Sequence, residues 1–503
     1  MSSMPSKIPL FKLTVEEHGI IHDIKDAVVR IDGLPGCLTG ELVDMGDDVL
    51  GLVMEFDQDS VCALALGATS KLRMGKHVHA RSQPFVIQAG EGSLGRMVTA
   101  LGVPCDESGD LLDTEEVPVF RAAPSLMERA PIDRMLLTGT KLIDALIPIG
   151  LGQRQLILGD RMTGKTSIAL DAILQQHDTG VLCIYCCVGK SMSSLEKVMS
   201  SLVSGHALGY TAIVAATDNA PAAEQYLAPF TAAAIGHWFV QRGKDVLLVF
   251  DDLTKHAWAY RQLSLLLDRP PGREAYPGDI FYMHTQLMEQ AGCFNERHGS
   301  GTMTFMALAD TQQGDLTGYI PSNLISMCDG QIILSNSMFA EGIRPAIDPQ
   351  MSLSIVGGRS HLPILRDLSV NVRTRHAAYL EIEQLSRLSS LSDDAKQIML
   401  RGEAIREIFH QGHHMLCSVA ELVLLLYALR EGYLDDLPLE SKRAFCSLIG
   451  DFARDMHPGL VRHIEQVEEL TPDTEDGIRQ ILKDWQAQEN HDVEELAEEE
   501  GCS

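Results

Sequence analysis

The sequence predicts a multidomain fold with a small N-terminal β-barrel, a central α/β domain and a C-terminal bundle of α-helices. Short alternating apolar runs, broken by glycines and acidic turns, fill the first part of the chain. Longer apolar runs that alternate with helical stretches follow, and beyond about residue 367 only helical periodicity remains. A chain of 503 residues has room for about three domains. We place these domains at residues 1–86, 87–366 and 367–503.

Four short runs with the composition of β-strands predict the first domain. They are residues 27–31, 40–43, 49–54 and 61–66. Glycines and acidic turn residues separate them, so each strand can reverse into the next. Short strands spaced this closely favour a barrel, in which the sheet closes on itself and leaves no exposed edge.

Six apolar runs in the second region predict strands that are buried on both faces of a sheet. The six runs are residues 156–158, 181–185, 212–215, 246–250, 304–308 and 331–334. Helical stretches lie between them, and this alternation is typical of a mostly parallel α/β sheet.

A complete G-x-x-x-x-G-K-[ST] phosphate-binding motif, or P-loop, follows the first of these strands and opens a helix. The motif consists of Gly159, Asp160, Arg161, Met162, Thr163, Gly164, Lys165 and Thr166. Its glycines let backbone N–H groups point at phosphate oxygens, beside the positive end of the helix dipole. We expect Lys165 to reach the terminal phosphates and the Thr166 hydroxyl to hold Mg²⁺. The flanking strand and helix favour a nucleotide site over an ordinary glycine-rich turn.

The strand at 246–250 ends in two acidic residues, Asp251 and Asp252. Parallel strands bring their carboxyl ends to one edge of a sheet, where the ligands of such sheets bind. An acid after a buried strand is common by itself, but here it accompanies a phosphate-binding motif. We therefore expect Asp251 to hold Mg²⁺ through a water molecule.

Helix signals mark the third region. Ser418 and Glu421 have the spacing of a capping box ahead of an apolar run, and Gly432 is placed to end that helix. Pro472 is placed to begin another helix. The chain ends in an acidic tail at 492–500, which we expect to be frayed and to which we assign no function.

The overall charge and the side-chain inventory exclude several classes of function. Lys and Arg number 41 against 69 Asp and Glu, and a formal charge of −28 argues against a nucleic-acid partner. No apolar run approaches the ~20 residues needed to cross a bilayer, so we expect membrane contact only through partner proteins. Eleven cysteines without a signal peptide fit a reducing cytosol. His410, His413 and His414 have part of a metal-ligand spacing, but a polar helix end is the commoner meaning.

Long segments beyond the phosphate-binding motif closely resemble the α subunit of F-type ATP synthases. They read DDLTK at 251–255, AYRQLSLLL at 259–267, RPPGREAYPGD at 269–279, TQQGD at 311–315, YIP at 319–321 and GIRPAI at 342–347. The resemblance runs from about residue 17 to about residue 485. The chain is accordingly identified as a divergent bacterial member of that family, which implies a RecA-like fold for the P-loop domain.

The resemblance also implies ligands and partners. In the family the chain binds ATP or ADP with Mg²⁺, and the base is expected near Arg344, Pro345 and Gln411. Its implied partners are β subunits in an alternating α3β3 ring, a γ central stalk, and a peripheral stalk of δ and b subunits. The implied location is the cytoplasmic face of the bacterial inner membrane, where the chain is a peripheral membrane protein.

One departure from the family pattern concerns catalysis. Lys190 follows Gly189 where α subunits usually carry glutamine and catalytic β subunits place the glutamate that orients water. A protonated lysine cannot act as that base. We expect this site to bind nucleotide without turning it over.

A second departure lies at the expected interface with the neighbouring subunit. Ile355, after Ser352 and Ser354, stands where the family has an arginine that reaches the phosphates in the neighbouring catalytic site. Arg359 is a candidate replacement, because four extended residues span up to ~13–14 Å. The alternative meaning of Arg359 is an exposed surface arginine.

Two further departures concern length. The N-terminal segment looks short for the family, in which a longer segment helps fix the ring to the peripheral stalk. The segment at 291–300 is also short, which we interpret as a loop change without chemistry.

Two classes of function fit these observations. The first is a non-catalytic, regulatory nucleotide-binding α subunit of a rotary, proton-transporting ATP synthase, which couples ATP synthesis or hydrolysis to a membrane ion gradient. The second is a degenerate or hydrolysis-only paralogue, or an export-type P-loop ATPase on the same fold. An export ATPase acts alone and needs the catalytic glutamate that Lys190 replaces, so we favour the first.

Overall fold

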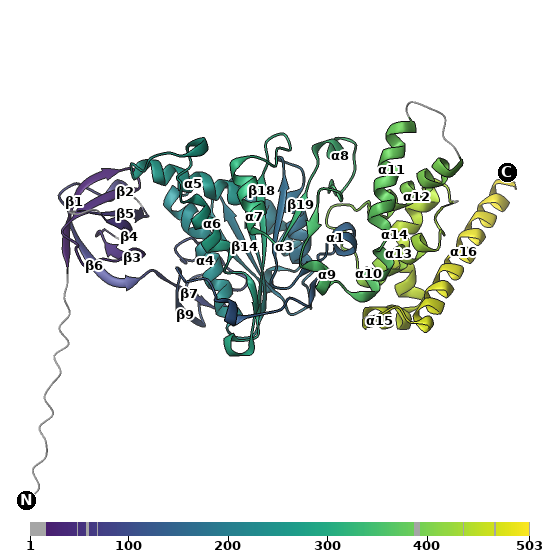
Figure 1. The fold of residues 1–503 in the computed structure, drawn as a ribbon. Helices are drawn as coiled ribbons and strands as arrows, with labels where there is room; N and C mark the ends of the chain where they lie inside the picture. Colours follow the sequence, from purple (N-terminus) through teal and green to yellow (C-terminus); the bar gives the residue numbers. More distant parts are fainter. Residues whose placement is uncertain are drawn as a thin grey trace, which may run out of the picture.

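The computed structural model describes residues 17–47, 49–56, 60–67, 69–386, 393–435, 437–466 and 469–501. The barrel, the α/β domain and the helical region follow one another along the length of the molecule (Figure 1). This arrangement confirms the predicted fold class, whereas the boundaries at residues 86 and 366 stay a prediction. Residues 1–16, which include the N-terminal segment that looks short for the family, lie outside the described residues.

Six strands close the N-terminal barrel in the order β1-β2-β5-β4-β3-β6. Its interior is apolar, with Val29, Val43, Val53 and Val78 fully buried. The sequence did not predict β1 and β6, because histidines and charged residues interrupt their apolar pattern. The strands are β1 His18–Lys25, β2 Val28–Asp32, β3 Glu41–Asp44, β4 Leu50–Phe56, β5 Ser60–Leu66 and β6 His77–Pro84.

The six runs predicted in the second region all form strands of one sheet. The order of its main path is β20-β19-β13-β18-β16-β14-β15-β8, and every neighbouring pair from β19 to β8 is parallel. The strands are β8 Met97–Thr99, β13 Arg154–Gly159, β14 Leu182–Val188, β15 Thr211–Ala216, β16 Asp245–Asp251, β18 Thr302–Asp310, β19 Gly330–Ile333 and β20 Leu353–Ser354. The predicted mostly parallel sheet is confirmed.

Helices cover both faces of this sheet, and alternate residues of one strand enter different cores. In β16, Leu247 and Val249 join the core that includes α2 and α3, whereas Leu248 and Phe250 join the core that includes α4 and α5. The covering helices are α2 Lys165–Leu174, α3 Met192–Ser204, α4 Ala222–Val240, α5 Leu253–Leu266, α6 Ile280–Met288 and α7 Tyr319–Met327. Burial on both faces explains why these strands read as continuous apolar runs.

Shorter elements surround the sheet. Strand β17 pairs with β18 and with β10, while β7 pairs with β9 and β11 with β12. These elements are β7 Val86–Gly90, β9 Thr114–Pro118, β10 Arg129–Ala130, β11 Met135–Leu136, β12 Ile149–Gly150, β17 Gly292–Phe294, α1 Lys141–Leu146, α8 Asn336–Ala340 and α9 Gly357–Ser360.

The C-terminal region is a helical bundle around α13, in which every residue from 420 to 429 except Glu421 is buried. The Ser418 hydroxyl caps α13 by accepting the Glu421 N–H, as predicted, and Gly432 follows the helix with φ +74°. The reciprocal half of the predicted capping box is wrong, because the Glu421 carboxylate pairs with Lys141 instead. The helices are α10 Pro363–Ser369, α11 Val372–Ser386, α12 Asp393–Phe409, α13 Val419–Arg430, α14 Leu439–Met456, α15 Pro458–Gln466 and α16 Pro472–Gly501.

Helix α16 begins at Pro472, as predicted, and continues through the acidic tail. The expectation of a frayed tail is therefore not met, because its backbone is helical as far as Gly501. In the described part of the chain, no helix combines the length and the apolar character that a membrane span requires.

Candidate functional site

The predicted phosphate-binding loop lies between the end of β13 and the start of α2. Gly159 is the last residue of β13, and a Cβ there would lie 2.7 Å from the Thr163 hydroxyl and 2.8 Å from the Leu334 side chain. Gly164 has φ +104° and immediately precedes α2. Both positions therefore require glycine, for space at Gly159 and for backbone conformation at Gly164.

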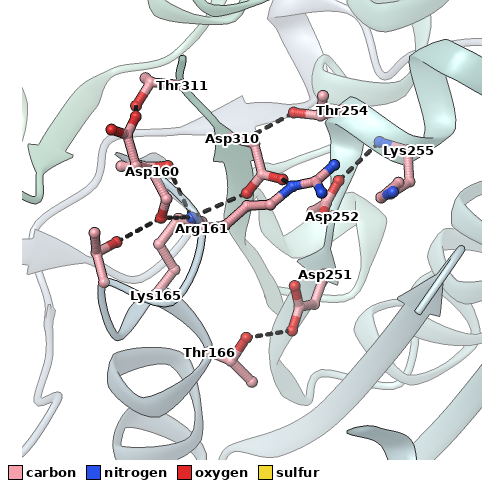
Figure 2. Close-up of polar contacts among 12 residues, drawn as sticks. Asp160, Arg161, Lys165, Thr166, Asp251, Asp252, Thr254, Lys255, Asp310 and Thr311 are labelled. Atoms are coloured by element: carbon pink, nitrogen blue, oxygen red, sulfur yellow. Dashed lines mark hydrogen bonds and ion pairs between the residues drawn. The ribbon is translucent and has the colours of Figure 1, made fainter. Parts of the chain in front are cut away.

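The ammonium group of Lys165 lies over this loop and is almost fully buried. Its Nζ donates to the carbonyl oxygens of Gly159 at 2.8 Å and Asp160 at 2.7 Å, and it pairs with Asp310 Oδ1 at 3.0 Å (Figure 2). These contacts use all three donors of the group. A phosphate that binds Lys165 must therefore replace at least one of these acceptors.

Asp160, Arg161, Met162 and Thr163 contribute to the loop in different ways. Asp160 accepts hydrogen bonds from the Thr311 hydroxyl and the Gly314 N–H, so it braces the loop against the segment after β18. The Thr163 hydroxyl donates to the Asp160 carbonyl oxygen at 2.8 Å. The side chains of Arg161 and Met162 are exposed, and Arg161 Nε lies 3.5 Å from Asp310 Oδ2.

Thr166, in the first turn of α2, meets Asp251, the last residue of β16, at the edge of the sheet where β13 and β16 end. The Thr166 hydroxyl donates to Asp251 Oδ2 at 2.7 Å, and the Tyr185 hydroxyl donates to the same oxygen at 2.8 Å. Burial, followed by the charge of Asp251, raises the pKa of Tyr185 well above its usual value, so Tyr185 remains a donor. A hydroxyl and a carboxylate are the hard oxygen ligands that Mg²⁺ prefers, so this pair fits the predicted metal.

Lys190 contacts the other oxygen of the same carboxylate. Its Nζ lies 2.6 Å from Asp251 Oδ1 and 3.9 Å from Asp252 Oδ2. Burial alone lowers the pKa of Lys190, but the carboxylates of Asp251 and Asp252 outweigh burial and raise the pKa overall. Lys190 therefore carries a charge and cannot accept a proton from water.

Asp252 and Asp310 complete the acidic side of the site. The Asp252 carboxylate accepts the Lys255 N–H at 2.7 Å and thereby caps α5. Burial, and then the nearby carboxylates of Asp251 and Asp310, raise the pKa of Asp252 to about 7. Asp310 was not predicted as a site residue, although it ends an apolar strand in the same way as Asp251 does.

A cavity of about 760 Å³ opens beside the loop, a size typical of small-molecule sites. Its charged lining contains more cations than acids, so it favours an anionic ligand. The cations are Arg161, Lys165, Lys190, Lys197 and Lys255, and the acids are Asp218, Asp252 and Asp310.

The residues expected at the base lie close to one another but outside this cavity. The Gln411 N–H donates to the Arg344 carbonyl oxygen at 2.8 Å, while the Arg344 guanidinium lies over the Phe339 ring. Gln411 lines a cavity of about 860 Å³, and Pro345 lines another of about 370 Å³. The structure thus groups Arg344, Pro345 and Gln411, but it does not join them to the phosphate loop in one cavity.

Two histidines whose spacing partly resembles that of metal ligands, His413 and His414, connect these regions. His413 contacts the Ser167 hydroxyl at 3.0 Å and lines the cavity of the loop. His414 contacts Asp171 Oδ1 at 2.7 Å and lines the cavity of Gln411. Both partners lie on α2, so this histidine pair fixes the segment after α12 to the helix that follows the phosphate loop.

The four expected interface positions divide into two groups. The Ser352 hydroxyl accepts the Ile333 N–H, and the Ser354 hydroxyl accepts hydrogen bonds from Gln153 and from the Gly357 N–H. Ile355 and Arg359 are exposed, and 74% of the Ile355 side chain is accessible. The serines therefore stabilise the turn, while Ile355 and Arg359 are available to a neighbour.

Comparison with known proteins matches every domain of the chain. Models of the ATP synthase alpha/beta family match its β-barrel domain at residues 14–80, its nucleotide-binding domain at 139–354 and its C-terminal domain at 362–485.

Curated relatives named ATP synthase subunit alpha match nearly the whole chain. The relative from Dichelobacter nodosus is 40% identical over 483 residues, which are 94% of each chain. The relative from Legionella pneumophila strain Lens is 39% identical over 95% of each chain. The relative from Nitrosomonas europaea is 38% identical over 95% of this chain and 96% of its own.

Proposed function

Because this chain belongs to the ATP synthase alpha/beta family, we propose that it is the non-catalytic, regulatory nucleotide-binding α subunit of an ATP synthase. One observation carries the proposal. A complete phosphate-binding loop and its partner carboxylate, Asp251, are combined with a lysine at position 190. The first two features support nucleotide binding, and the third argues against turnover.

We infer that the loop binds the phosphates of ATP or ADP. The residues proposed to do so are Gly159, Asp160, Arg161, Met162, Thr163, Gly164, Lys165 and Thr166. The backbone N–H groups at the start of α2 and the cations of the cavity supply the attraction for the anion. Mg²⁺, when bound, supplies charge neutralisation of the phosphates, with Thr166 and Asp251 as its proposed ligands.

We propose that Arg344, Pro345 and Gln411 hold the base. Their mutual contacts support this, as do the contacts of His413 and His414, which follow Gln411 closely in the chain, with Ser167 and Asp171 on α2. The separate cavities imply that the base site forms through side-chain adjustment when the nucleotide binds.

The absence of turnover follows from charge. In phosphoryl transfer a base or water-positioning group must orient the attacking water. Lys190 is a cation paired with two carboxylates, so it can attract an anion but cannot take a proton. The proposed role of the bound nucleotide is to order the subunit and its contacts.

We propose β subunits of an alternating α3β3 ring as the immediate neighbours, with γ as the central stalk and δ and b as the peripheral stalk. Exposed apolar side chains of Met351, Leu353, Ile355 and Val370 support a protein contact near the β20 turn. The proposed location is the cytoplasmic face of the bacterial inner membrane, and the proposed transported ion is the proton.

Purification of the tagged chain from detergent-solubilised membranes tests this assignment. We expect a β-type subunit to co-purify in a 1:1 ratio together with a γ-type subunit. Recovery of the chain alone, or as a self-assembled ring, would favour the degenerate paralogue or the export-type ATPase.

A further inference from the structure

We propose that Lys190 acts as a built-in cation at the Asp251 and Asp252 carboxylates, and that nucleotide affinity in this chain therefore depends only weakly on Mg²⁺. The inference rests on the proposed function, because it specifies the ionic form of the nucleotide that the same site accepts. The ligand is a nucleoside di- or triphosphate, which binds with or without its metal.

Contacts around Asp251 are the first support. The carboxylate is 1% exposed, and both of its oxygens already have close partners. Oδ2 accepts the hydroxyls of Thr166 at 2.7 Å and Tyr185 at 2.8 Å, and Oδ1 pairs with Lys190 Nζ at 2.6 Å. The negative charge on which a Mg²⁺ ion depends here is thus already paired with a cation of the chain.

The backbone around Lys190 holds this cation in place. The Gly189 N–H donates to the Ala216 carbonyl oxygen at 2.7 Å, and the Asp218 N–H donates to the Lys190 carbonyl oxygen at 2.9 Å. Directly afterwards, the Ser191 hydroxyl caps α3. Lys190 therefore lies in a short turn between β14 and α3 whose backbone is fixed by hydrogen bonds. Its ammonium group is in place before a ligand binds.

Charge balance explains the expected effect on metal dependence. Mg²⁺ raises nucleotide affinity by neutralising phosphate charge while its own charge is balanced by acidic side chains. In this site the single charge of Lys190 offsets one of the two negative charges of Asp251 and Asp252, and its ammonium repels a divalent ion placed beside Asp251. Lys165 and Lys190 also line the cavity together, so the metal-free phosphates already face two cations.

Equilibrium titration of the full chain with ATP, in excess Mg²⁺ and in excess EDTA, tests the inference. We expect removal of Mg²⁺ to weaken the parent by no more than about threefold, since the Lys190 charge is retained. In Lys190→Gln the same removal should weaken binding by at least ~10-fold, because the metal becomes the main partner of Asp251.

Two further variants are matched controls. Lys190→Arg retains the charge and should keep the small ratio between the two conditions. Lys197→Gln removes one cation from the same cavity without involving Asp251, so both affinities are expected to fall while their ratio stays at the parent value.

The outcomes separate this inference from the proposed function. A tenfold or larger loss of affinity in the parent on removal of Mg²⁺ overturns the role of Lys190 but leaves nucleotide binding intact. The role of Lys190 is also overturned if the ratio of ATP affinity in Mg²⁺ to ATP affinity in EDTA is the same in Lys190→Gln as in the parent. Failure of the parent to bind ATP under either condition overturns the nucleotide site itself.

Discussion

At the scale of single residues, the distribution of cations over carboxylates sets the properties of the site. Lys165 faces Asp310, and Lys190 faces Asp251 and Asp252. Lys165 is 5% exposed, and hydrogen bonds from a charged donor in such a dry place are strong. An incoming phosphate can therefore replace Asp310 as the partner of Lys165.

The first prediction concerns Lys165. Replacement by alanine should weaken ATP binding by about 1.5–3 kcal/mol, the usual contribution of a charged hydrogen bond. Calorimetric titration measures this, with Lys244→Ala as a control for an exposed lysine outside the cavity. Unchanged affinity in Lys165→Ala would remove the phosphate site from the loop.

The second prediction concerns the exposed Ile355. An arginine finger at a subunit interface accelerates phosphoryl transfer by roughly 10³–10⁵, and isoleucine cannot replace its charge. In a reconstituted assembly with β and γ subunits, Ile355→Arg should raise the steady-state rate of ATP hydrolysis at least ~10-fold.

Arg359→Ala, measured beside Ile355→Arg, shows whether Arg359 takes over the role of the missing arginine. A clear loss of rate in Arg359→Ala would assign that role to Arg359. Fast hydrolysis in the parent that neither substitution alters would falsify the need for an interface arginine from this subunit.

At the scale of elements, helices α5 and α6 bring uncharged histidines into the core under the sheet. The Nε2 atom of His256 on α5 lies 2.9 Å from the Tyr226 carbonyl oxygen. A carbonyl oxygen only accepts hydrogen bonds, so Nε2 is the donor. His284 on α6 accepts from the Asn323 side chain through Nδ1. Burial lowers the pKa of His256 to about 4 and that of His284 to about 3.

The third prediction follows from these lowered pKa values. Below about pH 6.5 the unfolded chain protonates both histidines, whereas the folded chain leaves them neutral until about pH 4 or lower. Stability is therefore fully present above pH 6.5 and is lost as the pH falls, by roughly 1.4 kcal/mol per pH unit for each histidine. These two histidines therefore lower the melting temperature between pH 7.5 and pH 5.5, and their share is measured as the difference between the parent and a variant without them.

The combined His256→Gln and His284→Gln variant isolates this effect. It should melt lower than the parent at pH 7.5 but lose less on acidification. The variant must be compared with the parent because other groups titrate over the same range. Burial raises the pKa values of Asp144 and Asp252 to about 7, so their protonation stabilises the folded chain as the pH falls. An equal acid-induced drop in variant and parent would exclude the histidines as its source.

At the scale of the whole molecule, one core extends from the nucleotide domain into the helical bundle. Ile168 on α2 and Leu425 on α13 belong to the same cluster of buried residues. An ion pair crosses this joint, with Lys141 Nζ at 3.0 Å from Glu421 Oε1. Lys141 also donates to the Cys446 carbonyl oxygen at 3.3 Å, and its N–H donates to Gln411. The joint therefore couples the proposed base site to the bundle.

The fourth prediction concerns this ion pair. The two side chains are 8% and 14% exposed, so Glu421→Gln leaves the Lys141 charge buried without its partner. Such a loss costs about 3–5 kcal/mol of unfolding free energy. Chemical denaturation measures it, with Asp393→Asn in the exposed Lys396 pair as a control expected to change stability by less than about 1 kcal/mol. If Glu421→Gln lowered the free energy of unfolding as little as Asp393→Asn does, the ion pair would have no structural role at the joint.

Patterns local to the chain predicted the fold class, and contacts distant in sequence escaped prediction. The phosphate loop, Asp251 and the Ser418 cap each carry a signal within a few residues. The pairing of Lys190 with Asp251 depends on β14 lying beside β16, where Cys187 is in register with Asp251. No local pattern encodes strand order, so the charge on Lys190 was predicted to prevent catalysis but its partner was not.

The central claim is that this chain binds nucleotide and does not turn it over. Titration of the purified chain with Mg-ATP, followed by an assay for phosphate release from the same sample, tests it most directly. We predict saturable binding at the loop and no sustained release of phosphate above the background without protein. Sustained phosphate release that Lys165→Ala abolishes, or no binding at all, would contradict the claim.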